Sequence, residues 1–375
     1  MPPEIPQGQP ESIMLKGFMG IKNTVDREDL GPRDLAGAVN VDIDDIGEPH
    51  RRRGRTRVAS GNYHSLWTAE DGTVYGVKNG ELGIVEPDYF FTVLLNDVGN
   101  LSDVGLTGVA FQQIKDQIYF SCATCSGVIT HSTGAVDNWG PAQDIWLSPI
   151  VNTSDTLPAI RGKLLGAPPL ASALAYYNGR IYMAAGSMLW ATEFQAYQYV
   201  DKNRGFIQFE ADITMVGVVS DGVYVGTTEG VYFLAGGSFE TLKRQRVMDS
   251  PVIPGSAVAI PGELGNPKQE SENQEPMQVS LGFMTTRGFC VGDEGGRCTN
   301  MTEATVFFPV AVFAAAMFRR QDGMNHYVVC LTSDGAPVNG ARIGKYVDPA
   351  IIRGNALWVD IADGAKATEG GFTYA

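Results

Sequence analysis

The chain has 375 residues, a formal net charge of −14, 45 glycines and 20 prolines. A negative charge of this size repels nucleic acid overall, and the most apolar run, residues 307–318, is shorter than the roughly 20 residues that a membrane-spanning helix needs. Abundant turn residues without a long amphipathic helical pattern predict one large all-β unit, because repeat folds exceed the usual domain length.

The first 16 residues carry neither a basic start nor an apolar core, so we expect an N-terminal extension and no signal peptide. The five cysteines are dispersed and odd in number, which does not fit a disulfide framework. The expected folding environment is therefore the cytoplasm.

Residues 40–47, Asn-Val-Asp-Ile-Asp-Asp-Ile-Gly, resemble the beginning of a calcium loop, because several carboxylates fall within a short segment. Ile46 occupies the fifth position of the loop, however, and no Glu stands at the twelfth position. Alternation of Val41 and Ile43 before a Gly turn predicts a β-hairpin with its polar residues facing outward. We expect neither a metal site nor a cofactor.

The most basic stretch follows directly and contains Arg51, Arg52, Arg53, Arg55 and Arg57. Clustered guanidinium groups suit phosphate binding, so DNA contact is one interpretation. The acidic chain as a whole opposes it, and arginines on an edge strand also serve the fold or pair with acidic neighbours in a subunit interface. These five residues are the candidate interface or DNA-contact residues.

A weak hairpin signature recurs from here onward: an apolar run, a Gly turn, an aromatic-bearing strand, and a second Gly turn before a third strand. Clear copies occupy residues 66–80, 174–186 and 215–234, and degenerate copies occupy 111–129, 281–301 and 310–332. Asp-Gly and Asn-Gly at the turns predict two-residue loops in which both central positions have positive φ.

One aromatic residue marks the second strand of each copy: Tyr75, Tyr119, Tyr182, Tyr224, Phe289 and Tyr327. They are separated by 44, 63, 42, 65 and 38 residues. Three of these spacings approach the roughly 40 to 45 residues of a four-stranded propeller blade. The two long gaps contain Pro-rich stretches, 139–169 and 251–276, which we interpret as insertions. The sequence thus predicts a β-propeller of six or seven blades over residues 17–338, with loop insertions.

Cys122-Ala-Thr-Cys125 has the spacing of half a zinc site or of a thioredoxin-type redox centre. The preceding residues, 118–121, form a strand pattern, and residues three apart in a strand face opposite sides of the sheet. We therefore interpret these cysteines as structural. Cys290 and Cys298 lack the usual ligand spacing, and the four histidines show no pattern of joint ligation.

Catalytic motifs are absent from the sequence. It contains no Gly-x-Ser-x-Gly elbow, no phosphate-binding Gly loop and no His-Glu-x-x-His helix. Residues 68–75 match a sialidase Asp-box only in part and indicate a hairpin. Nothing selects a glycosidase pair among the 42 Asp and Glu residues. We expect no enzymatic activity.

Several segments resemble the virion propellers of tailed phages. Those proteins open with a G-x-N motif and an N-x-D-x-D-x-x-G hairpin followed by R-R-x-G, and residues 17–23, 38–44 and 51–54 resemble this opening. Residues 189–193 and 213–234 are similar to central-blade strands of the same group. The resemblance covers residues 17 to about 332, but the Pro that commonly follows the paired Arg is missing here.

The resemblance implies a structural virion protein, the tail nozzle or tail-tube component of a short-tailed phage. Such proteins form rings, typically hexamers, around a channel that retains the genome and lets double-stranded DNA pass at ejection. Implied partners are tail adaptor or portal-side ring proteins and tail fibres, and the implied location is the virion after synthesis in the host cytoplasm. An acidic lining would let DNA pass without sticking.

In that setting, the stretches 139–169 and 251–276 supply ring contacts or a channel gate, or they are exposed loops. Residues 339–375 close the propeller or reach a neighbouring subunit. Two other functions fit the same fold. A carbohydrate-binding or glycoside-cleaving propeller predicts stacked aromatics at the ring mouth, with Trp139, Trp146 and residues 197–199 as candidates. A cellular scaffold predicts a monomer with a peptide groove.

Overall fold

The computed structural model describes residues 17–39, 41–44, 46–52, 58–100, 108–148, 162–261, 279–306, 311–321, 324–332, 355–360 and 366–371. Helical structure in these ranges consists of three short 3-10 turns, η1 (Arg27–Asp29), η2 (Phe239–Thr241) and η3 (Glu294–Gly296). Within the same ranges, no helix has the length and hydropathy needed to cross a membrane. The prediction of an all-β fold is confirmed.

The strands form antiparallel sheets in chain order. The first sheet contains β3 (Tyr63–Thr68), β4 (Val74–Lys78), β5 (Glu81–Val85) and β6 (Phe91–Leu95), and the second contains β7 (Ala110–Ile114), β8 (Gln117–Ser121), β9 (Ser126–Thr130) and β10 (Ala135–Asp137). The third is built on β13 (Ala173–Tyr177), β14 (Arg180–Ala185) and β15 (Met188–Glu193), with β16 (Ala196–Asp201) and β17 (Phe206–Gln208) both pairing with β15.

Three further sheets complete the series. The fourth contains β18 (Ile213–Val219), β19 (Gly222–Thr227), β20 (Val231–Ala235) and β21 (Lys243–Met248). The fifth contains β22 (Val258–Pro261), β23 (Val279–Thr285), β24 (Gly288–Gly292) and β25 (Cys298–Asn300), and the sixth contains β26 (Phe313–Gln321), β27 (Met324–Thr332), β28 (Asn355–Asp360) and β29 (Lys366–Gly371).

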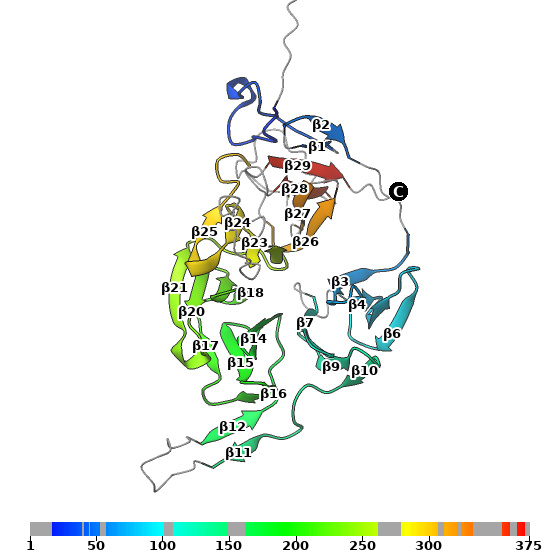
Figure 1. The fold of residues 1–375 in the computed structure, drawn as a ribbon, viewed down its shortest axis with the longest axis vertical. Helices are drawn as coiled ribbons and strands as arrows, with labels where there is room; N and C mark the ends of the chain where they lie inside the picture. Colours follow the sequence, from blue (N-terminus) through cyan, green and yellow to red (C-terminus); the bar gives the residue numbers. More distant parts are fainter. Residues whose placement is uncertain are drawn as a thin grey trace, which may run out of the picture.

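The sheets stand around a common centre in a propeller-like arrangement (Figure 1). One end strand of each sheet, which is β13 in the third, lies toward that centre, and neighbouring inner strands touch, as β7 does with β13 and β13 with β18. Apolar clusters fill the space between neighbouring sheets, such as the one shared by the first and second sheets. The fold therefore buries its core between radially placed sheets, as the recurring signature predicts.

The six aromatic residues of the signature explain this packing. Counted from the centre, each lies on the second strand of its sheet: Tyr75 on β4, Tyr119 on β8, Tyr182 on β14, Tyr224 on β19, Phe289 on β24 and Tyr327 on β27. None is more than 7% exposed. A second strand has a partner on both sides and a neighbouring sheet over its faces, so a large ring there contributes the most buried apolar area.

The turn prediction holds at Asn178-Gly179 and is wrong at Asp71-Gly72 and at Asp221-Gly222, where Gly222 belongs to β19 and neither residue has positive φ. Asn178 (φ 46) and Gly179 (φ 77) form a two-residue loop with both φ values positive. At Asp71-Gly72 only the glycine has positive φ, and the loop is longer. There the Asp71 carboxylate accepts hydrogen bonds from the backbone N–H and the hydroxyl of Thr73, at 3.0 and 2.9 Å. A side chain thus takes over part of the turn closure.

The two predicted insertions differ from each other. In the first, β11 (Ile145–Leu147) and β12 (Lys163–Gly166) form a hairpin that joins the third sheet through β16 and extends away from the ring of sheets (Figure 1). The second stretch contains β22, the first strand of the fifth sheet. Pro254 precedes this short strand and Pro261 is its last residue, so a regular strand of the repeat has the composition of a loop. Residues 262–278 lie outside the described ranges.

Both ends of the described chain meet at the sixth sheet. Strands β28 and β29 extend it from β27, and the two-stranded hairpin of β1 (Val41–Ile43) and β2 (Pro49–Arg51) contacts β29 (Figure 1). Upstream of this hairpin, the Asn23 N–H donates to the Thr305 carbonyl and the Thr24 hydroxyl to the Ala304 carbonyl, at 3.0 and 2.9 Å. The N-terminal segment is thereby fixed to the end of the propeller.

Candidate functional site

The inner strands enclose a cavity of about 620 Å³ at the centre of the propeller. Its lining comes chiefly from β3, β7, β13, β18 and β26, with side chains such as Leu66, Trp67, Phe111 and Phe313. Among the described residues that line it, none is Asp, Glu, Lys or Arg. The described lining is therefore mostly apolar, and it brings no pair of charged side chains together for catalysis.

The polar contacts at the cavity wall connect neighbouring sheets. Ser65 adopts φ 54 in an irregular part of β3, and its hydroxyl accepts the Val109 N–H at 2.8 Å. The His64 ring contacts the Ser65 oxygen through Nδ1 at 2.9 Å and the Gly99 carbonyl through Nε2 at 3.3 Å. Burial lowers the pKa of His64. These bonds join the first sheet to the second.

The basic stretch is divided by the fold. Arg51 is exposed on β2, whereas Arg52 is buried and forms an ion pair with Asp42, Nε to Oδ1 at 2.6 Å. Arg52 also donates to the Val41 carbonyl at 2.9 Å. Arg53, Arg55 and Arg57 lie outside the described residues. Arg52 therefore serves the N-terminal hairpin, while a role of Arg51 in an interface or in DNA contact stays a prediction.

Asp42 corrects the expectation that the polar residues of this hairpin face outward. It is 6% exposed, since Arg52 neutralises it and the hairpin packs on the sixth sheet. His326 on β27 lies beneath the same pair and is 3% exposed. Burial is the main cause that lowers the pKa of His326 to about 4; the charges of Arg319 and Arg52 also lower it, and the charge of Asp42 raises it. Asp42, Arg52 and His326 thus form a buried junction between the N-terminal hairpin and the sixth sheet.

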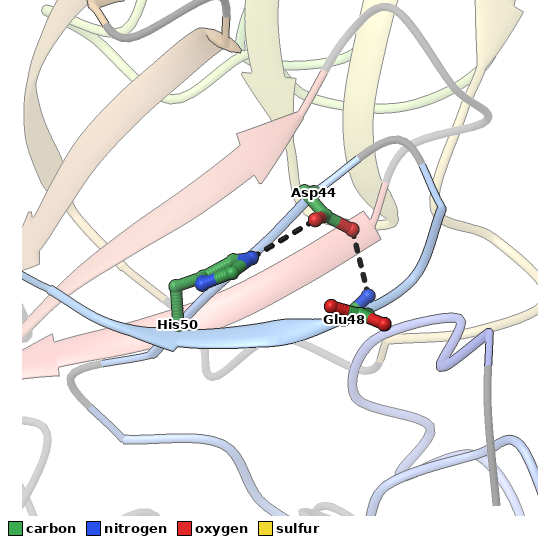
Figure 2. A group of neighbouring side chains, drawn as sticks. All are labelled: Asp44, Glu48 and His50. Carbon is green, nitrogen blue, oxygen red and sulfur yellow. Dashed lines mark hydrogen bonds and ion pairs between the residues drawn. The ribbon is translucent and has the colours of Figure 1, made fainter.

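The turn end of the hairpin gathers three ionisable side chains. Figure 2 shows Asp44, Glu48 and His50, whose ligand atoms all lie within 4.8 Å of one another. The Asp44 carboxylate contacts His50 Nε2 at 2.9 Å and accepts the Glu48 N–H at 2.7 Å. The hydrogen bond with His50 lowers the pKa of the Asp44 carboxyl.

The sequence predicted only part of this cluster, because the calcium-like segment, residues 40–47, includes Asp44 but neither Glu48 nor His50. The hairpin register brings the two together, because residues beside a turn come to lie opposite each other. Glu48 and His50 are exposed, and three ligands leave much of a cation's coordination to water. The geometry is that of a surface ion pair, and we assign it no metal.

An exposed apolar edge is the most unusual surface among the described residues. Ile145, Trp146 and Leu147 form the whole of β11 and are 41%, 57% and 47% exposed. On one side β11 pairs with β12, and the strand order gives it no partner on the other side in the described part of the chain. An unprotected apolar edge strand is a template for another chain.

Of the aromatic residues suggested for a sugar site, Trp139 and Tyr197 lie together in the core, whereas Trp146 lies apart from them. Trp139 is 3% exposed, packs on Tyr119 at a ring distance of 5.2 Å, and donates its Nε1–H to the Tyr197 carbonyl at 2.8 Å. It belongs to the core between the second and third sheets. Trp146 lies apart from it on the protruding β11.

The Cys122–Cys125 pair is placed differently from the prediction. Strand β8 ends at Ser121, so both cysteines lie in the turn before β9 and face each other across it. The interpretation that they point to opposite sides of a sheet is wrong, since Ala123 and Thr124 close a tight turn without the usual Gly or Asn.

Comparison of the sequence with protein-family models and with curated proteins gave no match. Among solved structures, the chain is similar to the WD40 domain of Pan2 from Neurospora crassa, with 11% identity, 84% of this chain and 80% of that one covered, and a TM-score of 0.42. It is also similar to BBS1N in complex with ARL6DN, with 11% identity, coverage of 76% and 77%, and a TM-score of 0.41. A third structure, the dihydro-heme d1 dehydrogenase NirN, shares 10% identity, coverage of 86% and 56%, and a TM-score of 0.41.

Proposed function

We propose that this chain is a structural propeller of six blades that assembles with copies of itself into a ring, as the tail nozzle of a short-tailed bacteriophage does. The apolar edge of β11 carries the proposal. The resemblance of residues 17–54 and 189–234 to virion propellers supports it, and so does the count of six sheets with four or more strands in the described residues.

The β11–β12 hairpin suits a contact between subunits. Its strand β12 pairs with β16 over two register pairs, Leu165 with Asp201 and Gly166 with Val200, and the Leu164 carbonyl accepts the Lys202 N–H at 2.8 Å. An ion pair between Lys163 and Glu193, at 2.7 Å, secures its base. Its outer strand thus stands clear of its own propeller, where a neighbouring copy can cover the side chains of Ile145 to Leu147 and pair with the free backbone edge.

DNA passes between the copies in this proposal, not through each propeller. The propeller cavity is lined by apolar side chains and offers neither the space nor the charge that a duplex requires. The ring opening would instead be bordered by outer surfaces of a chain with a net charge of −14, along which a polyanion moves without binding. Adaptor rings, tail fibres and a place in the virion belong to the same proposal, and the chain is not an enzyme.

The molar mass of the protein in solution tests this proposal. Multi-angle light scattering on the full chain should give an oligomer of closed symmetry, six copies being the expected number. Trp146→Lys should shift the mass to that of a monomer, because a charge in the centre of the contact must be desolvated on assembly.

Phe90→Lys is the matched control, because Phe90 is an exposed aromatic residue, 67% accessible, in the turn between β5 and β6. It should leave the mass of the oligomer unchanged. A wild-type chain that stays monomeric at every concentration, or an oligomer that Trp146→Lys leaves intact, would refute the role of β11.

A further inference from the structure

The turn between β8 and β9 contains two free thiols in contact. The Sγ atoms of Cys122 and Cys125 lie 3.2 Å apart. A backbone hydrogen bond from the Cys122 N–H to the Cys125 carbonyl, at 2.8 Å, holds the two residues opposite each other. A disulfide needs an S–S distance of about 2.05 Å, so little more than a side-chain rotation separates the dithiol from the bonded form.

The turn also stabilises negative charge on one sulfur. The Cys125 N–H donates to Cys122 Sγ at 3.2 Å, and the Thr124 hydroxyl oxygen lies 3.2 Å from the same atom. Hydrogen bonds from the Cys125 thiol and from the backbone N–H groups of Thr124 and Cys125 lower the pKa of Cys122 to about 5. The contact with Cys122 raises the pKa of Cys125, so the pair readily loses one proton and holds the other.

The two sulfurs differ in access. Cys122 is fully buried in the core shared by the first and second sheets, whereas Cys125 is partly exposed. An incoming reagent therefore meets Cys125 first. Thr124 donates its hydroxyl to the Val98 carbonyl at 3.2 Å, which fixes the turn against the end of the first sheet.

We propose that Cys122 and Cys125 form a redox modification site that reacts with small disulfides, of which glutathione disulfide is the model, and closes to an intramolecular disulfide. This site is independent of the proposed assembly through β11. It assigns a chemical role to a motif that the tail function leaves unused.

The exchange proceeds in balanced steps. The proton shared by the pair moves from Cys125 to Cys122, and the Cys125 thiolate attacks one sulfur of glutathione disulfide, releasing one glutathione thiolate. That thiolate takes the proton from Cys122. The Cys122 thiolate then attacks Cys125 Sγ and breaks the mixed disulfide, which releases the second glutathione thiolate. The chain loses two electrons and glutathione disulfide gains them.

The other cysteine pair provides an internal reference. Cys290 on β24 and Cys298 on β25 are also neighbours, but Cys298 is opposite Gly292, two residues from Cys290. Such diagonal positions are farther apart than the Cβ separation that a disulfide requires. The contact with Cys298 and burial raise the pKa of Cys290. This pair should therefore react much more slowly.

The test is native oxidation of the full chain in glutathione buffers at pH 7, with remaining thiols alkylated and peptides identified by mass spectrometry. The Cys122–Cys125 disulfide should form at least about tenfold faster than any bond between Cys290 and Cys298. A pair that stays reduced in the folded chain while it oxidises in urea, or equal rates for both pairs, would overturn the proposal.

Two variants test the order of attack. Cys122→Ser should retain glutathione on Cys125, because the resolving thiol is missing, whereas Cys125→Ser should gain no adduct in the folded state. Glutathione on Cys122 of the second variant, or on neither variant, would contradict the proposed steps. If the loss of buried Cys122 impairs folding, the proposal is decided by the rates at which the two cysteine pairs oxidise in the wild-type chain.

Discussion

Two outer edges of the same propeller have opposite chemistry. Strand β21, the outer strand of the fourth sheet, exposes Lys243, Arg244 and Arg246. Strand β11, the outer strand of the extended third sheet, exposes an isoleucine, a tryptophan and a leucine. Charged side chains on an edge strand keep it hydrated and prevent pairing with other chains.

The basic edge is also held in place by its own sheet. The Arg244 guanidinium lies over the rings of Phe209 and Tyr232, at 5.4 and 5.6 Å, and Arg246 pairs with Asp249 at 2.5 Å. No comparable charge protects β11 itself. Charge thus protects the edge of the fourth sheet, whereas the edge at β11 is apolar and exposed, which is the basis of the proposed contact.

The strongest contrast separates residues that fold the propeller from residues proposed to assemble it. Tyr224→Ala should lower the free energy of unfolding by about 3 to 5 kcal/mol, since a fully buried ring is lost from β19 together with its hydrogen bonds to the Asp293 and Arg297 carbonyls. Trp146→Ala should change the stability of the monomer by less than about 0.5 kcal/mol. Urea unfolding of both variants measures the difference, and similar losses would show that β11 belongs to the core.

A second contrast compares a buried charge with one at the edge. Arg52→Ala leaves the Asp42 carboxylate buried without its ion pair and should cost about 3 kcal/mol or more. Arg246→Ala removes an exposed pair and should cost less than about 1 kcal/mol. Thermal unfolding of the two variants measures both losses of stability. A loss for Arg52→Ala no larger than that for Arg246→Ala would contradict the prediction.

The buried junction also predicts a pH dependence that the edges lack. Since the pKa of His326 falls to about 4 in the folded chain from 6.5, protonation favours the unfolded state. Its contribution is fully present above pH 6.5 and is lost as the pH falls toward 4. Stability should drop by on the order of 2 kcal/mol between pH 7 and pH 5. Urea midpoints should show a smaller drop in His326→Gln; an equal drop in both proteins would exclude His326 as the cause.

Replacing charged residues of β21 with apolar ones, as in β11, should have the smallest effect on stability but a measurable effect on association. Lys243→Val combined with Arg244→Ile should change the free energy of unfolding by less than about 1 kcal/mol. It should introduce concentration-dependent association, detected by light scattering above the mass of the wild-type oligomer. If this variant keeps the wild-type mass, charge is not what protects the edge.

The sequence was sufficient for the propeller-like arrangement, because it depends on a repeated local pattern. Each signature aromatic residue, from Tyr75 to Tyr327, lies on the second strand of a sheet, where the pattern places it. The fifth sheet was less clear, since the prolines around β22 give its inner strand the composition of an insertion. Residues 339–375 as a closing or inter-subunit segment stay a prediction, although β28 and β29 within them pair onto the sixth sheet.

The side-chain contacts were harder to predict, because they depend on register and on distant elements. The burial of Asp42 requires both Arg52 and the sixth sheet, and the approach of Cys122 to Cys125 requires a turn without Gly or Asn. The burial of Trp139 depends on Tyr119 and Tyr197, which come from two different sheets. No local pattern contains these relations.

Electron microscopy of the purified full chain tests the central proposal most directly. We expect closed rings with a central opening wide enough for duplex DNA, in which the β11–β12 hairpin of each copy lies against its neighbour. Single propellers at every concentration, or rings in which the hairpin projects into solvent, would contradict the proposed assembly.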